Sequence, residues 1–133
     1  MGKTNTRGLV IDTDIIIDYL RQSKQSTAFK QLLSENDSQP SIASVTITEL
    51  WRGKSITQLK QRQKVNRLLN KLNIILADKT ISQKAGELLR KYRHLVLADA
   101  LVAATAIVNF FQLATFNKKH FEGITELVLY DKV

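Results

Sequence analysis

The chain has 133 residues, 44% of them hydrophobic and 24% charged, which is long and apolar enough to fold as one domain over residues 1–133. Five glycines and one proline exclude a collagen-like composition and disfavour a disordered chain, and the absence of cysteine excludes disulfides, thiolate catalysis and cysteine zinc sites. Twenty Lys and Arg against twelve Asp and Glu leave a net charge of +8, which suits a polyanionic partner such as RNA or DNA.

Short apolar, β-branched runs alternate along the chain with stretches in which apolar residues recur at helical spacing. In chain order they predict strand 8–11, a helix from residue 15, helix 27–35, strand 41–44, a helix from residue 46, helical residues 52–71, strand 74–76, helix 80–92, helix 98–111, strand 113–115 and strand 127–130. Thr80 and Gln83 have the spacing of a capping box, and a loop is expected over residues 117–120.

Strands that alternate with helices of this length predict a parallel sheet, because parallel strands need crossover connections whose helices cover both faces. The expected fold class is α/β, a three-layer α/β/α sandwich with a central, mostly parallel sheet of about five strands. In such sheets ligands bind beyond the carboxyl ends of the strands, where the strand order reverses. Residues that directly follow strands are therefore the first candidates for a functional site.

Neither an export signal nor a membrane span is expected. Asp12 and Asp14 interrupt the first apolar run, residues 9–17, and Asp99 interrupts the apolar run over residues 95–113. Together with the lack of cysteine, this favours a cytoplasmic protein that does not associate with a membrane.

Three acidic residues lie near predicted strand or helix ends. Asp12 follows the first strand, Glu49 lies shortly after the second, and Asp99 begins the helix that leads to the fourth. Asp99 is the only Asp, Glu, Lys or Arg between Arg93 and Lys118. Because this segment is so apolar, its helix must be largely buried, and a buried carboxylate needs a compensating partner.

Helix capping is the structural alternative for each of these acids. Asp99 has the place of an N-cap before an apolar helix, and Asp12 or Asp14 can cap the first helix. Glu49 lies three residues after Thr46, as in a capping box. Capping does not explain why all three acids are predicted at strand or helix ends on the same side of the parallel sheet.

A metal site is the functional interpretation of Asp12, Glu49 and Asp99. Clustered carboxylates repel one another unless a divalent cation neutralises them. Oxygen ligands in a chain with no cysteine and two histidines favour Mg²⁺ or Mn²⁺ over Zn²⁺. Such ions activate water for in-line attack on a phosphodiester, so the three acids and the positive net charge together predict nuclease chemistry.

Three segments resemble the PIN-domain ribonucleases, in particular the VapC toxins of bacterial toxin–antitoxin pairs. LVIDTDIIIDYL resembles the opening strand and first acid of that family, at Asp12, and SIASVTITELWRG resembles the segment of its second acid, at Glu49. LADALVAATAIVNFFQLATFNKKHF resembles the third acid, at Asp99, with the run into the fourth strand. The order, spacing and flanking residues match over nearly the whole chain.

The resemblance implies a PIN-like fold and a Mg²⁺- or Mn²⁺-dependent endoribonuclease whose catalytic and metal-binding residues are Asp12, Glu49 and Asp99. It also implies a structured RNA substrate such as tRNA or rRNA, a cognate antitoxin that blocks the site, and a homodimer.

Three further residues match positions near the site of that family. Thr13 and Thr115 match hydroxyl positions that place water or phosphate, with turn and strand-end roles as the alternative. The family often has a fourth acid where this chain has Asn117, which can hydrogen-bond a water ligand but brings no charge. The resemblance therefore leaves the second metal position open.

Alternative interpretations remain at the sequence level. The run Asp12-Thr13-Asp14 also resembles the nucleophile motif of haloacid dehalogenase-type phosphatases, although the chain leaves little length for a cap. A receiver domain would need an Asp at the end of the third strand, where Asp78 comes only after Leu76-Ala77. The main non-enzymatic alternative is a PIN-like module that binds RNA or protein without cutting, because Asn117 is uncharged.

A basic stripe is predicted on the helical residues 52–71, since seven Lys or Arg and no acid lie between Glu49 and Asp78. At about 100° per residue, four of these basic residues share one face away from the apolar side. They are Lys60, Lys64, Arg67 and Lys71. The stripe is either a solvated face or a surface that contacts RNA phosphates or an acidic antitoxin segment.

Overall fold

The structure is a computed structural model and describes residues 8–22, 27–36 and 39–133. The strands and helices of these residues alternate as the sequence predicts. In chain order they are β1 (Leu9–Ile11), α1 (Thr13–Arg21), α2 (Ala28–Glu35), β2 (Ser41–Ala43), α3 (Ser44–Trp51), the 3-10 helix η1 (Lys54–Thr57), α4 (Leu59–Leu69), β3 (Asn73–Ile75), α5 (Lys79–Lys91), α6 (Leu97–Asn109), β4 (Gln112–Ala114), α7 (Lys118–Phe121) and β5 (Val128–Leu129).

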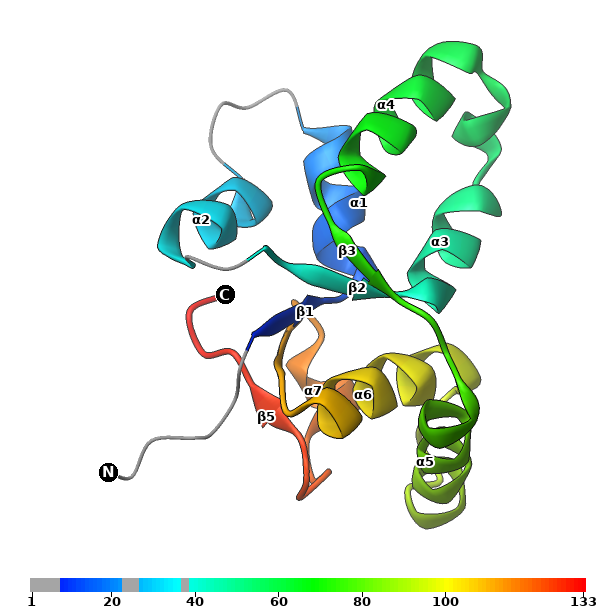
Figure 1. Cartoon of the computed structure of the whole chain (residues 1–133), viewed down its shortest axis with the longest axis vertical. Helices are drawn as coiled ribbons and strands as arrows, with labels where there is room; N and C mark the ends of the chain where they lie inside the picture. The colour runs from blue at the N-terminus through cyan, green and yellow to red at the C-terminus, as the bar shows by residue number, and fades with distance from the viewer. Residues whose placement is uncertain (1–7, 23–26, 37–38) are drawn as a thin grey trace.

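The strands form one parallel sheet in the order β3-β2-β1-β4-β5 (Figure 1). The chain starts at the centre with β1, moves outward through β2 and β3, and returns to the other side of β1 for β4 and β5. The strand order therefore reverses between β1 and β4, which makes this pair the point at which open α/β sheets bind ligands. The predicted fold class is confirmed, with a sheet that is parallel throughout.

Alternation along the central strands divides the core into two layers. Leu9 and Ile11 of β1 belong to an apolar cluster shared with α1, α2, α3 and α4, whereas Val10 belongs to a cluster shared with α5, α6 and α7. In β2, Ile42 and Ala43 are divided between the clusters in the same way. Figure 1 shows the two groups of helices on opposite sides of the sheet.

Capping side chains lie at the start of three helices, and at the start of α2 the Thr27 hydroxyl accepts the Lys30 N–H at 3.2 Å. Oδ1 of Asp12 accepts the N–H of Thr13 at 2.8 Å at the start of α1, so Asp12 does cap this helix. Oδ1 of Asp78 accepts the N–H of Ile81 at 2.9 Å at the start of α5. The predicted capping box at Thr80 is therefore wrong, because Asp78 occupies the capping position and Thr80 lies inside the first turn.

Several other boundaries differ from the prediction, among them the division of residues 52–71 into η1 and α4. Helix α3 begins at Ser44, directly after β2, so Ser44 is not part of the strand. Helix α6 begins at Leu97 after the N-cap Val96, which makes no side-chain capping bond. The predicted loop over residues 117–120 contains α7, a single helical turn in which the His120 N–H donates to the Asn117 carbonyl at 3.0 Å.

Helix α6 is the most deeply buried helix of its layer. Its buried side chains are mostly small: Ala100, Val102, Ala103, Ala104, Thr105 and Ala106. Small side chains let the helix pack closely on the sheet, which brings its first turn near the carboxyl ends of the strands. At 13 residues it is short, and none of the helices in the described part of the chain has the length and apolar character needed to cross a bilayer.

Replacing Asp78 by Ala should lower the free energy of unfolding by about 1 kcal/mol, because the N–H of Ile81 loses its side-chain acceptor. Urea unfolding measures this change. Thr80→Ala is the matched control, since Thr80 is exposed within the same helical turn, and it should change stability by no more than about 0.5 kcal/mol. Equal losses in the two variants would contradict the assignment of the cap to Asp78.

Candidate active site at the carboxyl edge of the sheet

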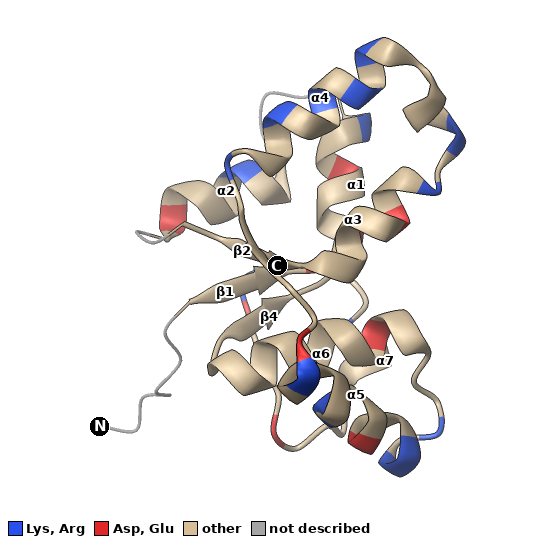
Figure 2. Cartoon of the chain, turned by 45° about the vertical axis from the view of Figure 1, so that its right-hand side comes forward, with Lys and Arg blue, Asp and Glu red and all other residues tan. Residues whose placement is uncertain are grey.

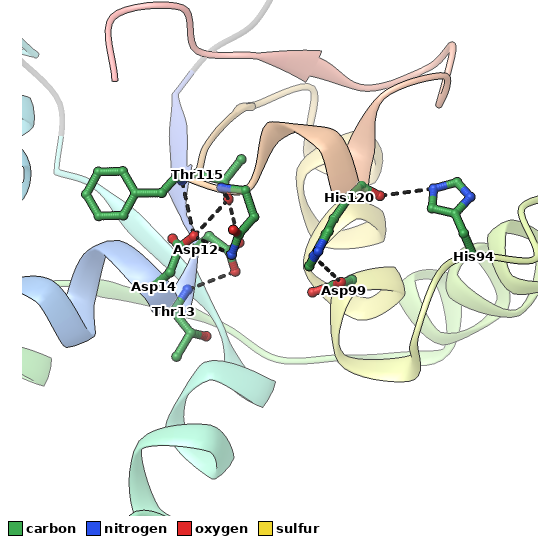
Figure 3. A network of polar contacts seen from close by, with 9 residues as sticks. Asp12, Thr13, Asp14, His94, Asp99, Thr115 and His120 are labelled. Carbon is green, nitrogen blue, oxygen red and sulfur yellow. Dashed lines mark hydrogen bonds and ion pairs between the residues drawn. The ribbon is translucent and has the colours of Figure 1, made fainter.

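The pairing of β1 with β4 brings together the residues that follow these strands. Ile11 pairs with Ala114, and the N–H of Asp12 donates to the Ala114 carbonyl at 2.9 Å. Asp12 and Thr115 therefore leave neighbouring strands at the same edge. The Thr115 hydroxyl donates to Oδ2 of Asp12 at 2.8 Å, and both residues are buried (Figure 3).

Asp14 binds the loop between β4 and α7. Its Oδ2 accepts the Phe116 N–H at 3.1 Å and the Asn117 side-chain amide at 3.0 Å, and it lies 3.3 Å from the Thr115 hydroxyl. That hydroxyl has one proton, which goes to Asp12 at the shorter distance, and it accepts the Asn117 N–H at 3.0 Å. Oδ1 of Asp14 is buried and has no hydrogen-bond partner among the described residues.

Glu49 is held at the site through Thr13. The Thr13 hydroxyl donates to Oε1 of Glu49 at 2.6 Å and lies 2.9 Å from the hydroxyl of the buried Thr46. Since the Thr13 N–H also binds Asp12, one residue connects the first two predicted acids. A capping box does not account for Glu49, because α3 begins at Ser44 and Glu49 lies in the body of the helix.

Asp99 comes from the other helical layer and pairs with His120. Its Oδ2 lies 3.4 Å from Nδ1 of His120, and the backbone carbonyl of His120 lies 3.1 Å from Nε2 of His94 (Figure 3). The N-cap of α6 is Val96, so helix capping does not account for Asp99 either. The Asp99 side chain keeps 23% of its surface exposed and is open to solvent on one side.

The electrostatics of Asp12 place three of the acids within one another's field. Burial, and then the negative charge of Asp14, raise the pKa of Asp12 to about 7, and Asp99 adds to the rise, while hydrogen bonds from Thr115 and Thr13 oppose it. Burial also raises the pKa of Asp14. At neutral pH the metal-free protein therefore keeps a proton on Asp12 in a substantial fraction of molecules.

The structure links the predicted site residues to one another, but they do not form a ready ligand set. Asp12 is connected to Glu49 through Thr13 and feels the charge of Asp99. Over residues 8–22, 27–36 and 39–133, no group of three His, Asp or Glu side chains is arranged to hold a metal ion. The donors are all oxygen and repel one another, which fits a hard divalent cation. The ligand set Asp12, Glu49 and Asp99 stays a prediction.

The structure divides the predicted basic stripe. Lys60 and Arg67 are exposed on α4, and Lys71 is exposed beyond its end. Lys64 is half-buried, and its Nζ donates to the Leu20 carbonyl at 3.0 Å, so it ties α4 to α1. Figure 2 shows Lys and Arg gathered over α4 and the connection from α3. The contact of this surface with RNA or an antitoxin stays a prediction.

The sequence analysis misses two residues of this edge, Asp14 and His120. It names Asp14 only as a possible helix cap, although Asp14 lies two residues after Asp12 in the same acidic turn. His120 lies three residues after Asn117, so the two residues lie on the same side of the short helix α7. Their pairing with Asn117 and Asp99 depends on contacts between distant segments, which no local pattern contains.

Comparison with known proteins identifies the family of the chain. The sequence matches the family model described as PIN domain over residues 9–127. It is 32% identical over 123 residues to Ribonuclease VapC10 of Mycobacterium tuberculosis, covering 90% of each chain. It is 33% identical over 130 residues to Ribonuclease VapC1 of Methanocaldococcus jannaschii, covering 93% of this chain and 88% of the relative.

Solved structures share the fold. A toxin–antitoxin complex from Klebsiella pneumoniae superposes with a TM-score of 0.76 at 30% identity, covering 91% of this chain and 96% of the other. VapBC2 from Rickettsia felis, bound to a DNA fragment from its promoter, has a TM-score of 0.80 at 24% identity and covers 93% and 98%. The chain therefore belongs to the PIN-domain family and, within it, to the VapC group.

The stability of the metal-free protein should fall as the pH rises from about 4 to about 7. In this range the unfolded chain has released the proton of Asp12 while the folded protein retains it, so folding is favoured at the low end and the advantage disappears near the folded pKa of about 7. The fall should amount to about 2–4 kcal/mol. Thermal or urea melts in EDTA across this pH series measure it.

Asp12→Asn should remove most of this pH dependence and raise the melting temperature at pH 8, since the amide keeps an acceptor for the Thr13 N–H without the charge. Glu87→Gln, at an exposed carboxylate on α5, is the control and should leave the pH dependence as in the wild type. A wild-type protein whose stability rises from pH 4 to pH 7 would contradict the assignment to Asp12.

Proposed function

We propose that this protein is an endoribonuclease that depends on Mg²⁺ or Mn²⁺ and acts as the toxin of a toxin–antitoxin pair. The proposal is supported by relatives named as VapC ribonucleases, by the fold shared with toxin–antitoxin complexes, and by a net charge of +8. The observation that carries it is that Asp12, at the carboxyl edge where the strand order reverses, is linked to Glu49 through Thr13 and is acted on by the charges of Asp14 and Asp99.

Asp12, Glu49 and Asp99 are the residues that would hold the metal. A bound divalent cation supplies activation of water and stabilisation of the charge that develops on the phosphate and leaving oxygen during phosphodiester hydrolysis. The raised pKa of Asp12 follows from burial and from like charges, both of which a cation offsets. Metal binding is therefore expected to release the proton from Asp12 and to be favoured at higher pH.

The neighbouring side chains keep the acids in place. Thr13 joins Glu49 to the turn after β1, so a carboxylate on α3 is oriented by the central strand. Thr115 holds Asp12 from the end of β4. His120 pairs with Asp99 from α7 and limits the rotation of that carboxylate. Such outer contacts fix the direction in which ligand oxygens point.

RNA, an antitoxin and a second copy of the chain are the proposed partners. Structured RNA such as tRNA or rRNA is the proposed substrate class. A cavity of about 90 Å³ borders Glu49 between α1, α3, η1 and α4, with apolar side chains such as Leu50 and Ile56 and the charged Arg21 in its lining. A mixed lining of this kind suits an antitoxin segment that reaches Glu49 and blocks the site.

Wild-type protein should cleave structured RNA in Mg²⁺ or Mn²⁺, and EDTA should stop cleavage. Asp12→Asn, Glu49→Gln and Asp99→Asn should each lower the rate by at least about 10- to 100-fold while the fold is retained, because each removes one proposed ligand. Gel analysis of tRNA and rRNA with purified variants provides the measurement.

Glu87→Gln is the control for this series and should cleave like the wild type, because Glu87 is an exposed carboxylate on α5 that pairs with Lys84. A wild-type protein that binds RNA but does not cut it in either metal would overturn the proposal in favour of a non-catalytic RNA-binding module. A large loss of stability in Asp99→Asn would assign Asp99 a structural role instead.

The exposed part of the basic stripe should add salt-dependent affinity for RNA. Replacing Lys60, Arg67 and Lys71 together by Gln removes three positive charges without disturbing the bond from Lys64 to Leu20. If these side chains contact phosphates, the slope of log affinity against log salt should flatten by up to about 2, since each contact contributes about 0.7 on single strands. Filter binding across a salt series tests this.

A triple variant on α5 serves as the matched control, since it removes the same charge from the other helical layer. Its substitutions to Gln are at Lys79, Arg90 and Lys91. Equal flattening in both triple variants would mean that net charge, and not the α4 surface, determines the slope. An unchanged slope in the α4 variant would remove the stripe from the RNA interface.

A further inference from the structure

Asp14 has more hydrogen bonds on one carboxylate oxygen than on the other. Oδ2 is within hydrogen-bond distance of donors from three consecutive residues, Thr115, Phe116 and Asn117. Oδ1 is buried and has no hydrogen-bond partner in the described part of the chain. Anchoring the β4–α7 loop explains the first oxygen but leaves the second unaccounted for.

Asp14 makes no ion pair within the described residues, and Arg21, which borders the same cavity, does not pair with it. The ion pairs of residues 8–22, 27–36 and 39–133 join Lys84 to Glu87 and Glu126, and His120 to Asp99, and none of them includes Asp14. A buried carboxylate oxygen without a donor or counter-charge is costly. The negative charges of Asp12 and Asp14 repel each other, and both carboxylates lie within hydrogen-bond distance of the Thr115 hydroxyl.

We propose that Asp14 is a further metal-binding residue of this site, whose free oxygen Oδ1 is available to a divalent cation held by the neighbouring Asp12. The inference rests on the proposed metal-dependent function. It assigns different tasks to the two oxygens: Oδ2 holds the loop, and Oδ1 faces a ligand that the protein itself does not supply.

Because the side chains of Asp14 and Asn117 are hydrogen-bonded to each other, mutation can move the carboxylate from position 14 to position 117. Oδ2 of Asp14 accepts the Asn117 amide at 3.0 Å, so exchanging the two residue types reverses donor and acceptor and keeps the contact. The site then has the same number of carboxylates, one of them now on the β4–α7 loop. A role that depends on charge survives this exchange, whereas a role that depends on anchoring from α1 alone does not.

Calorimetric titration with Mn²⁺ tests the proposal. We expect Asp14→Asn to weaken Mn²⁺ binding by about 10- to 100-fold, and the exchanged variant, Asp14→Asn with Asn117→Asp, to recover most of the affinity. Glu87→Gln, at an exposed carboxylate on α5, should bind as the wild type does. Wild-type affinity in Asp14→Asn, or an exchanged variant no better than Asp14→Asn, would overturn the proposal and leave Asp14 as a loop anchor.

The single variant Asn117→Asp gives a second measurement that does not require Asp14→Asn to fold. In EDTA it places a carboxylate against Oδ2 of Asp14, where an amide now donates, so its melting temperature should fall. Saturating Mn²⁺ should raise the melting temperature of this variant by more than that of the wild type. An equal shift in the two proteins would show that no cation is shared by positions 14 and 117, against the proposal.

Mn²⁺ titration of the wild type, Asp12→Asn and Asp14→Asn distinguishes an error in the proposed metal dependence from an error in the role of Asp14 alone. If the wild type itself binds no Mn²⁺, the proposed metal dependence is wrong and the role of Asp14 is wrong with it. If the wild type binds Mn²⁺, Asp12→Asn does not, and Asp14→Asn binds normally, only the assignment of Asp14 is wrong.

Discussion

The parallel pairing of β1 with β4 is the constraint on which the rest of the site depends. It places the N–H of Asp12 on the carbonyl of Ala114 and so aligns the two strand ends to within one residue. Because the chain reaches β4 only after leaving β1 for two other strands, this edge has no crossover directly between the two strands. The residues that follow them face each other there, and Thr115 can bind both Asp12 and Asp14.

The second consequence of this topology is that the two helical layers each contribute an acid to one edge. Glu49 belongs to α3, which packs on the face of α1, and Asp99 belongs to α6, which covers the opposite face. The small buried side chains of α6 let its first turn approach, so the charge of Asp99 acts on Asp12 through the protein.

Hydroxyls and amides, and not cations, satisfy the buried acids. Thr13 and Thr115 donate to Glu49 and Asp12, and Asn117 donates to Asp14. Neutral donors orient a carboxylate without neutralising it, so the repulsion between Asp12 and Asp14 persists in the folded protein and raises the pKa of Asp12. An arrangement that keeps negative charge unneutralised is poor for stability and suitable for binding a cation.

The sequence by itself determined the fold class and the succession of strands and longer helices along the chain, because these follow from periodicity. It also singled out Asp12, Glu49 and Asp99 by their places near predicted strand and helix ends. Helix boundaries were less well determined, since Asp78 and Thr80 are both reasonable caps and only packing selects between them. The tertiary structure alone decided that Asp14 binds Asn117 and that Asp99 pairs with His120. Those contacts join segments that strand pairing and layer packing bring together, and the energies of such long-range contacts leave no periodic signal in the chain.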